Sequence, residues 1–251
     1  MHNAECLWRL PAIPPVLLPT EVHVWCASLA ASPAIIQTLR ALLSADELTR
    51  ANRFYFEKDR NHFTVARGLL RILLGRYLTI APEQLRFSYN QYGKPSLDLA
   101  AATAMLQFNI SHSQDFALLA FTYDRSVGVD IEYMRVIEYE QLAKHSFSPH
   151  EQAALQALPL SLRQEGFYNC WARKEAYIKA RGKGLSLPLD SFDVSLGRGE
   201  AARLLASRED RREVLRWSLQ ALTPPVNYAG ALVVEGKDWQ LKQWRWVFPA
   251  E

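Results

Sequence analysis

Residues 127–132 read Val127-Gly128-Val129-Asp130-Ile131-Glu132, an alternation of apolar and acidic side chains that predicts a β-strand. Because side chains two residues apart share one face of a strand, Asp130 and Glu132 project together, opposite the valines. Two adjacent carboxylates suit a hard cation such as Mg²⁺. A half-buried strand with a solvated acidic face is the alternative interpretation, and the rest of the sequence has to distinguish the two.

The elements predicted around this strand follow the same order in both halves of the chain. The first half predicts a strand over residues 21–29, helices over 35–50 and 60–78, and strands over 85–90, 106–111 and 116–123. The second half predicts a strand over 126–133, helices over 138–147, 149–158 and 163–181, and strands over 191–196, 214–221 and 228–235. This order indicates an α+β protein with a duplicated unit, divided into residues 1–125 and 126–251.

Each half has one long helix with an apolar face at helical spacing. Phe63, Ala66, Leu70 and Tyr77 mark this face in the first helix, and Phe167, Cys170, Trp171 and Ile178 mark it in the second. Each helix is expected to cover the sheet of its own half. Ligand chemistry is then expected in the cleft between the halves, since domain junctions often hold pockets.

The composition is that of a globular protein with mild basicity. The chain has 251 residues, of which 49% are hydrophobic, and 29 basic and 26 acidic residues give a net charge of +3. This balance is compatible with an acidic ligand and gives no argument for nucleic acid. Cys6, Cys26 and Cys170 are widely spaced, without a zinc or redox pattern, and predict free thiols in a reducing cytoplasm. Four prolines within residues 11–19 interrupt any apolar run, so we expect no signal segment and no membrane partner.

A third carboxylate lies in the long second-half helix, within Trp171-Ala172-Arg173-Lys174-Glu175-Ala176-Tyr177-Ile178-Lys179. Glu175 and Lys179 are four residues apart and share a helix face, so a surface salt bridge is one interpretation. The other places Glu175 beside Asp130 and Glu132, because this helix and that strand belong to the same half. Three carboxylates suit Mg²⁺ that shares its remaining positions with water and substrate phosphates. Such a site predicts a phosphorylated substrate.

Two segments of the first half could hold that phosphate. Phe108-Asn109-Ile110-Ser111-His112-Ser113 runs from a strand into a turn rich in hydrogen-bond donors, although Ser and Asn also end strands routinely. Tyr92-Gly93-Lys94-Pro95 predicts a tight turn, whose glycine allows close backbone approach and whose lysine could reach an anion.

A basic face also runs along the first-half helices. It comprises Arg50, Arg53, Arg60, Arg67 and Arg71. These side chains could contact phosphate or simply solvate the surface. Arg67 is the preferred ligand among them, because its neighbours Ala66 and Gly68 leave it least crowded.

Four segments taken in order resemble the motifs of the Sfp-type 4′-phosphopantetheinyl transferases. They are Gly93-Lys94-Pro95, Phe108-Asn109-Ile110-Ser111-His112-Ser113, Gly128-Val129-Asp130-Ile131-Glu132 and Trp171-x-x-Lys174-Glu175-Ala176-x-x-Lys179. The run Gly182-Lys183-Gly184-Leu185-Ser186-Leu187-Pro188-Leu189 is similar to that family as well. The resemblance implies an α+β enzyme of two similar subdomains in a pseudo-twofold arrangement. Each subdomain would be a small, mostly antiparallel sheet packed on a long helix, with coenzyme A and Mg²⁺ in the cleft.

The resemblance also implies roles for individual residues. Asp130, Glu132 and Glu175 match the family's magnesium ligands, and Lys179 matches a lysine that contacts the phosphate on the pantetheine side. Ile131 stands where some relatives have a third acid, so a water could complete the metal shell.

The nucleotide-binding residues implied by the resemblance lie in the first half. His112 matches the histidine near the 3′-phosphate of coenzyme A, with Ser111 beside it, and Gly93, Lys94 and Pro95 line the adenine nucleotide. Arg50 and Arg67 are the implied basic ligands. Their transfer from the family is less direct, because Glu47 and Phe63 stand where some relatives place coenzyme A-contacting side chains.

The implied reaction moves 4′-phosphopantetheine from coenzyme A to a serine hydroxyl of an apo acyl or peptidyl carrier protein and releases adenosine 3′,5′-bisphosphate. Glu175 would be the general base, directly or through a metal-bound water, and Lys179 would stabilise the leaving phosphate. Carriers of fatty-acid, polyketide and nonribosomal-peptide pathways all suit such an enzyme. Phe147, Phe167 and Tyr168 could form an apolar docking surface for the carrier or belong to the core.

Two other functional classes remain open from the sequence. One is a non-catalytic coenzyme A-binding module that docks on carriers, and the other is a Mg²⁺-dependent nucleotide pyrophosphohydrolase. Because the duplicated chain already contains both sides of the cleft, a monomer is expected.

Overall fold

Two β-sheets form the centre of the protein, and a computed structural model describes them within residues 8, 11, 15–98 and 105–248. The first sheet contains β1 (Glu21–Ser28), β4 (Leu106–Ser113), β5 (Phe116–Tyr123) and β11 (Gln240–Trp246), in the order β11-β1-β5-β4. The second contains β6 (Val127–Tyr133), β9 (Trp217–Leu222) and β10 (Tyr228–Glu235), in the order β6-β10-β9. All pairs are antiparallel except β1 and β11, which are parallel.

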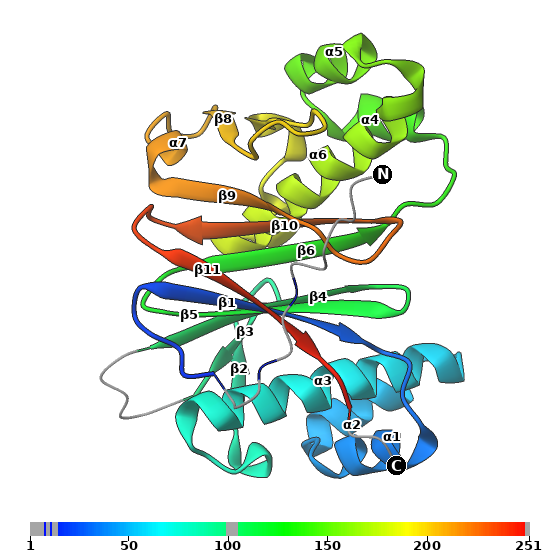
Figure 1. The fold of residues 1–251 in the computed structure, drawn as a ribbon, viewed down its shortest axis with the longest axis vertical. Helices are drawn as coiled ribbons and strands as arrows, with labels where there is room; N and C mark the ends of the chain where they lie inside the picture. The colour runs from blue at the N-terminus through cyan, green and yellow to red at the C-terminus, as the bar shows by residue number, and fades with distance from the viewer. Residues whose placement is uncertain (1–7, 9–10, 12–14, 99–104, 249–251) are drawn as a thin grey trace.

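The helices lie on the outer faces of these sheets. α1 (Pro33–Ala41), α2 (Ala45–Asn52) and α3 (Glu57–Leu78) lie beyond the first sheet, and α4 (Tyr139–Ser146), α5 (Pro149–Ala157) and α6 (Leu160–Arg181) beyond the second (Figure 1). Two small hairpins complete the fold with the short α7 (Glu213–Arg216): β2 (Phe87–Tyr89) with β3 (Pro95–Leu97), and β7 (Phe192–Val194) with β8 (Leu204–Ser207). None of the described helices combines the length and apolar character needed to cross a membrane.

Three apolar clusters hold the layers together. One joins α6 to the second sheet, one joins α3 to the first sheet, and the third lies between the sheets. Val127, Val129 and Ile131 of β6 belong to the cluster between the sheets, while Asp130 of the same strand is buried on the other face. The alternation in residues 127–132 therefore works as predicted, and its acidic face is directed toward α6.

The duplication predicted from the sequence is present in the element order. β1-β5-β4 in the first sheet corresponds to β6-β10-β9 in the second, and each half has a hairpin and a helix of 22 residues, α3 or α6. The expected α+β fold, with small and mostly antiparallel sheets each packed on one long helix, is confirmed.

Several element boundaries differ from the prediction. The single helix predicted over 35–50 is two helices, because the chain breaks at Leu42–Ser44 and Ser44 forms a capping box with Glu47. The strand predicted over 214–221 begins with the helical turn α7, so β9 starts at Trp217. The sequence analysis did not predict β3, β8 or β11.

β11 also crosses the predicted subdomain boundary. It comes from the end of the chain, yet it pairs with β1, for example Trp244 with Trp25, and extends the first sheet. Residues 240–246 therefore belong structurally with the first half, while the division at residue 125 remains a prediction for the rest of the chain. Of the cysteines, Cys26 and Cys170 are buried, and Cys6 lies outside the described residues.

Candidate active site

Side chains rather than a main-chain ladder join β4 to β6, at the junction of the two halves. The Val129 N–H donates to Asn109 Oδ1 (2.8 Å), and Ser111 Oγ donates to Asp130 Oδ1 (2.8 Å). One step further along, Ser113 Oγ accepts the N–H of the last residue of β6 (3.0 Å). Residues 109, 111 and 113 share one side of β4, which is why this strand can bind along β6.

Asp130 is the most deeply buried acid at this junction. Its Oδ1 accepts hydrogen bonds from Lys179 Nζ (2.6 Å) and from Ser111 Oγ (2.8 Å). Its Oδ2 is buried and has no hydrogen-bond partner among the described residues. Burial raises the pKa of Asp130, although Lys179 and Ser111 act in the opposite direction. An unpaired buried carboxylate oxygen is costly and indicates a site for a further ligand.

Glu132 and Glu175 lie near enough to Asp130 to interact with its charge. Burial, followed by the charge of Asp130, raises the pKa of Glu132 to about 7, and Glu175 adds to this effect. Burial and the charge of Asp130 also raise the pKa of Glu175. The strand and the helix therefore bring the three predicted metal ligands into one electrostatic cluster.

These carboxylates do not form a preassembled metal site. Among the described residues, no three His, Cys, Asp or Glu side chains are placed to hold a metal ion. The Lys179 ammonium lies against Asp130 instead, at 2.6 Å. The donor set still fits Mg²⁺, because a hard cation would stabilise three neighbouring carboxylates, of which Asp130 raises the pKa of the other two, and one unpartnered buried oxygen.

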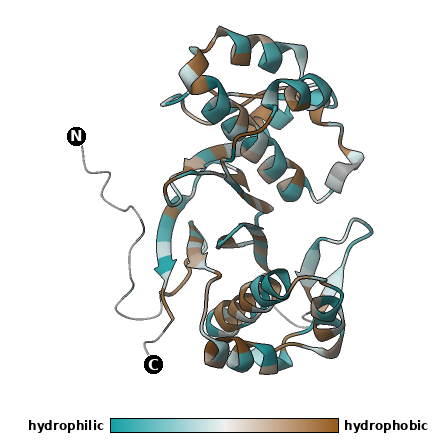
Figure 2. Cartoon of the chain, turned by 90° about the vertical axis from the view of Figure 1, so that its right-hand side faces the viewer, coloured by the Kyte–Doolittle hydropathy of each residue, from teal (hydrophilic) through white to brown (hydrophobic). Residues whose placement is uncertain are grey.

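A cavity of about 250 Å³ lies beside the cluster and is lined from both halves of the chain. Its lining includes Gly93, Lys94, Pro95, Glu175 and Lys179. In Figure 2 the β2–β3 hairpin, which carries the first three, extends from the lower lobe toward the upper one. Five predicted site residues from two distant segments are thus brought to one cavity.

His112 lies at the exposed end of β4, in a group of cations. Partial desolvation lowers its pKa, and the charges of Lys179, His62 and Arg50 lower it further. Arg50 itself rests over the Phe63 ring at 5.5 Å. This concentration of positive charge suits a phosphate group.

Arg67 has a different environment from the one predicted. It is buried, and its Nε pairs with Glu47, which also binds Arg71 at 2.6 Å. Its Nη2 donates to the Tyr89 hydroxyl (2.9 Å). The structure therefore does not bring Arg67 to the cavity, and its role as a coenzyme A ligand remains only a sequence prediction. Nothing in the local sequence indicated Glu47, which comes from another helix.

A second cavity, of about 330 Å³, lies on the side of Glu132. Its lining includes Tyr133, Phe167, Tyr168 and Trp171 as well as Glu132. Phe167 and Tyr168 also belong to the buried core, as one of the two sequence interpretations has it, and a docking role for them remains a prediction. Phe147 is buried in the core and is not among the residues that line the cavity. Because Glu175 lines one cavity and Glu132 the other, the carboxylate cluster lies between them.

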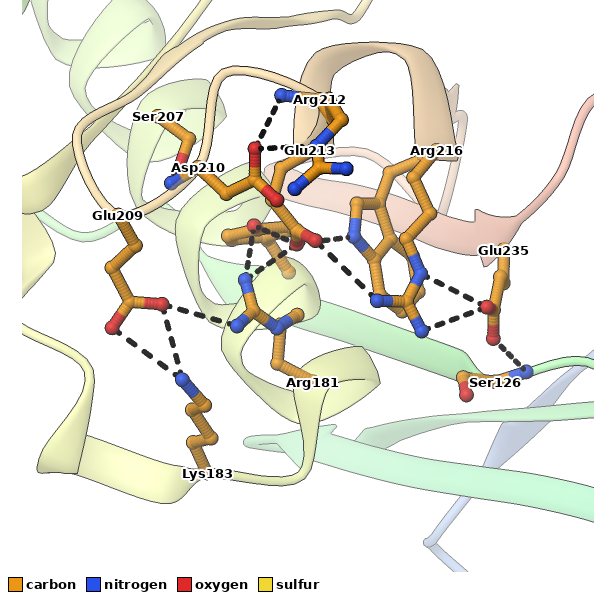
Figure 3. Close-up of polar contacts among 12 residues, drawn as sticks. Ser126, Arg181, Lys183, Ser207, Glu209, Asp210, Arg212, Glu213, Arg216 and Glu235 are labelled. Carbon is orange, nitrogen blue, oxygen red and sulfur yellow. Dashed lines mark hydrogen bonds and ion pairs between the residues drawn. The ribbon is translucent and has the colours of Figure 1, made fainter.

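A network of charged residues holds the end of α6 around Arg181 (Figure 3). Arg181 binds Glu213 (2.5 Å) and Glu209 (3.1 Å), and Lys183 also binds Glu209 (3.1 Å). The sequence analysis did not identify this network. Its acidic members lie in a charged segment that pairs with α6 only in the folded chain.

Comparison with known proteins finds similarity to 4′-phosphopantetheinyl transferases over both halves of the chain. Residues 126–233 match a family model described as the 4′-phosphopantetheinyl transferase superfamily, and residues 29–123 match one described as 4′-phosphopantetheinyl transferase, N-terminal. The chain is 42% identical over 231 residues to the 4′-phosphopantetheinyl transferase HetI of Nostoc sp., covering 92% of this chain and 94% of HetI.

Two Bacillus proteins are similar over shorter stretches. The 4′-phosphopantetheinyl transferase Sfp of Bacillus subtilis is 38% identical over 157 residues, covering 62% of this chain and 67% of Sfp. The 4′-phosphopantetheinyl transferase psf-1 of Bacillus pumilus is 31% identical over 185 residues, covering 73% of this chain and 77% of psf-1. The match to HetI extends over nearly all of both chains, and the chain belongs to the 4′-phosphopantetheinyl transferase family.

Proposed function

We propose that this chain transfers 4′-phosphopantetheine from coenzyme A to a serine hydroxyl of an apo carrier protein and releases adenosine 3′,5′-bisphosphate. The observation that carries this proposal is the carboxylate cluster between two cavities, one lined by Glu175 and Lys179 and the other by Glu132 and aromatic residues. Transfer to a protein hydroxyl requires that donor and acceptor reach one phosphorus atom from opposite sides. Two cavities on either side of one carboxylate cluster fit this requirement.

The cavity of about 250 Å³ is the proposed site of the coenzyme A nucleotide. Gly93 and Pro95 would line the adenine nucleotide, and His112 with Arg50 and Ser111 would lie at the 3′-phosphate. The cationic surroundings that lower the pKa of His112 support this assignment, because an anion would stabilise them.

Asp130, Glu132 and Glu175 are the proposed ligands of Mg²⁺. When bound, Mg²⁺ offsets the negative charge of a pyrophosphate. In the structure the Lys179 ammonium interacts with Asp130. Lys179 would be directed at the phosphate of coenzyme A, where its positive charge would stabilise the leaving group.

Glu175 is the proposed general base. It takes the proton of the serine Oγ, which forms a bond to the pantetheine-bearing phosphorus as the bond from that phosphorus to the bridging oxygen breaks. The bridging oxygen leaves with its electron pair on adenosine 3′,5′-bisphosphate. Burial of Glu175 and the charge of Asp130 raise its pKa and make it a stronger base.

The acceptor serine would enter from the cavity of about 330 Å³, with Tyr168 and Trp171 on its wall. The carrier is proposed to be an acyl or peptidyl carrier protein, and its acidic face would suit the net charge of +3. We further propose a monomer that acts in the cytoplasm, where coenzyme A and its carriers are available.

Intact-mass measurement of apo carrier proteins with coenzyme A and Mg²⁺ tests the proposal. The carrier is expected to gain one phosphopantetheine group per acceptor serine, and Glu175→Gln is expected to abolish the gain without loss of fold. Release of adenosine 3′,5′-bisphosphate with no carrier modification would favour a pyrophosphohydrolase. Binding of coenzyme A without either reaction would favour a docking module.

A further inference from the structure

The turn between β2 and β3 lies on the C-terminal end of α6, so that the two halves meet at one wall of the nucleotide cavity. Lys94 Nζ donates to the main-chain oxygens of Lys179 (2.7 Å), Val127 (3.1 Å) and Ala180 (3.5 Å). Beside it, Asn90 Nδ2 donates to the main-chain oxygen of Gly182 (2.9 Å). The ammonium of Lys94 is therefore occupied by main-chain oxygens from the other half.

The turn itself holds Lys94 in this direction. Asn90 Oδ1 accepts the N–H groups of Tyr92 and Lys94, both at 2.9 Å, and Gly93 has φ +80°, a value that glycine adopts without strain. A hydrogen bond from the Gly93 N–H to the Asn90 oxygen (2.9 Å) closes the turn. The side chain of Lys94 therefore starts from a backbone that the turn holds in place.

The contact is also favourable electrostatically. The last carbonyls of a helix lack partners within the helix and lie at the negative end of its dipole. Those of Lys179 and Ala180 are in this position at the end of α6, where the Lys179 oxygen also accepts the N–H of Gly182 (3.2 Å). Burial lowers the pKa of Lys94 to about 8. The hydrogen bonds of its ammonium among the described residues all go to main-chain oxygens, two of them at the end of α6.

We infer that Lys94 is a positioning residue: by binding the main chain of Lys179, it fixes where the Lys179 ammonium meets the phosphate of coenzyme A. This inference rests on the proposed function. Lys179 is the residue through which Lys94 would act, since its Nζ lies 2.6 Å from Asp130 and 2.9 Å from Ser111. The family resemblance implies that Lys94 lines the adenine nucleotide, and Lys94 does line the cavity. Only a direct contact between its ammonium and the ligand would require that group to leave three main-chain oxygens.

A double-mutant cycle of Lys94→Met and Lys179→Met tests this inference. Lys94→Met keeps an apolar stem of the same length, with sulfur in place of one methylene group, and removes the ammonium. In the otherwise wild-type chain we expect kcat for transfer to fall about tenfold or more, while the KM for coenzyme A changes less. In the Lys179→Met chain the same substitution is expected to change kcat by less than about twofold, because its effect passes through Lys179.

Equal losses of kcat in both backgrounds would overturn the inference, and so would an unchanged kcat in the wild-type background. Asn90→Asp is the second variant, because it keeps the acceptor of the turn and replaces the donor to Gly182 by a charged oxygen that repels the Gly182 carbonyl. It is expected to lower kcat in the same direction. Thr122→Val is the control: it removes a buried hydrogen bond to the Glu21 oxygen (3.2 Å) in the first sheet and is expected to leave kcat unchanged.

The same experiment separates this inference from the proposed function. A wild-type chain that modifies no carrier contradicts the proposed function. The cycle is then measured as affinity for coenzyme A by calorimetry, and additive losses would overturn the inference. Non-additive losses would support it.

Discussion

Gly128 of β6 lies directly against the main-chain oxygen of Ala176 in α6. A Cβ atom at Gly128 would overlap that oxygen and the nitrogen of Ala180. The absence of a side chain therefore sets how closely the strand approaches the helix. Since Asp130 follows two residues after Gly128 on the same face, and Glu175 precedes Ala176, this approach also sets the separation of the proposed metal ligands.

Gly128→Ala is expected to destabilise the protein, because the new methyl group meets main-chain atoms that cannot rotate away. Overpacking of this kind costs about 1–3 kcal/mol of unfolding free energy. In a chain of this size that corresponds to roughly 2–4 °C in Tm for each kcal/mol. Thermal unfolding followed by circular dichroism measures the change.

Gly199→Ala is the control, because it also introduces a methyl group but has open space around it. Its positive φ alone is expected to cost about 1 kcal/mol, and Gly128→Ala is expected to lose more than this control. Equal losses in the two variants would contradict the close approach of β6 to α6.

Glu132→Gln is expected to stabilise the metal-free protein at alkaline pH. The pKa of Glu132 in the folded chain is about 7, above its usual value of 4.5, so the folded state holds this proton more tightly than the unfolded state does. The contribution of Glu132 to stability is therefore present at low pH and is lost as the pH rises toward 7. Urea unfolding with a chelator should show little difference between variant and wild type at about pH 5 and a more stable variant at about pH 8.

The same measurement with Mg²⁺ in place of the chelator examines the metal site. Mg²⁺ should raise the unfolding free energy of the wild type at about pH 8 and have a smaller effect on Glu132→Gln, which has lost a ligand. A difference between variant and wild type that is independent of pH would show that Glu132 has an ordinary pKa.

Glu213→Ala is expected to lower the unfolding free energy by about 3 kcal/mol, because it leaves several buried donors without an acceptor. Glu213 is buried and accepts hydrogen bonds from Arg181 (2.5 Å), Trp217 (2.7 Å) and the Tyr177 hydroxyl (2.9 Å). Denaturant unfolding measures the loss. Glu209→Gln is the matched control in the same network, and its exposed ion pairs should contribute less than about 1 kcal/mol. A comparable loss in both variants would mean that burial does not distinguish the two acids.

A fragment of residues 15–125 is expected not to unfold cooperatively on its own. It would expose the β1 edge that pairs with β11, and Trp25 would lose its contacts with Trp244 and Trp246. Calorimetry and hydrogen exchange on the fragment and the full chain test this expectation. A sharp transition in the fragment would support an independent first subdomain with its boundary at residue 125.

Local patterns in the sequence were sufficient for much of the fold. The alternation in residues 127–132 correctly predicted which side chains of β6 face the core, because a strand has one periodicity and the apolar face must be buried. The break between α1 and α2 also had a local signal, the Ser44-Ala45-Asp46-Glu47 capping box. No local signal predicted where β11 pairs, because its partner β1 lies more than two hundred residues earlier.

The residues of the candidate site also fall into two groups: those whose placement follows from the local sequence, and those whose placement depends on distant segments. Glu175 and Asp130 could be brought together from the sequence, because one helix and one strand of the same half carry them. The direction of Lys94 and the burial of Arg67 could not be predicted from the sequence, because each depends on atoms from a distant segment. Lys94 is directed by the main-chain oxygen of Lys179, and Arg67 is held by Glu47. Flanking small residues made Arg67 look accessible, but on a helix the neighbours that cover a side chain come from the next turns and from other helices.

The parallel pairing of β1 with β11 also determines when the protein can fold during its synthesis. β1 is complete at residue 28, but its second neighbour begins only at residue 240. At about 5–20 residues per second, the ribosome leaves this edge open for roughly ten seconds or more. Throughout that interval the strand is available to chaperones or to another nascent chain, and a prematurely terminated polypeptide never closes it.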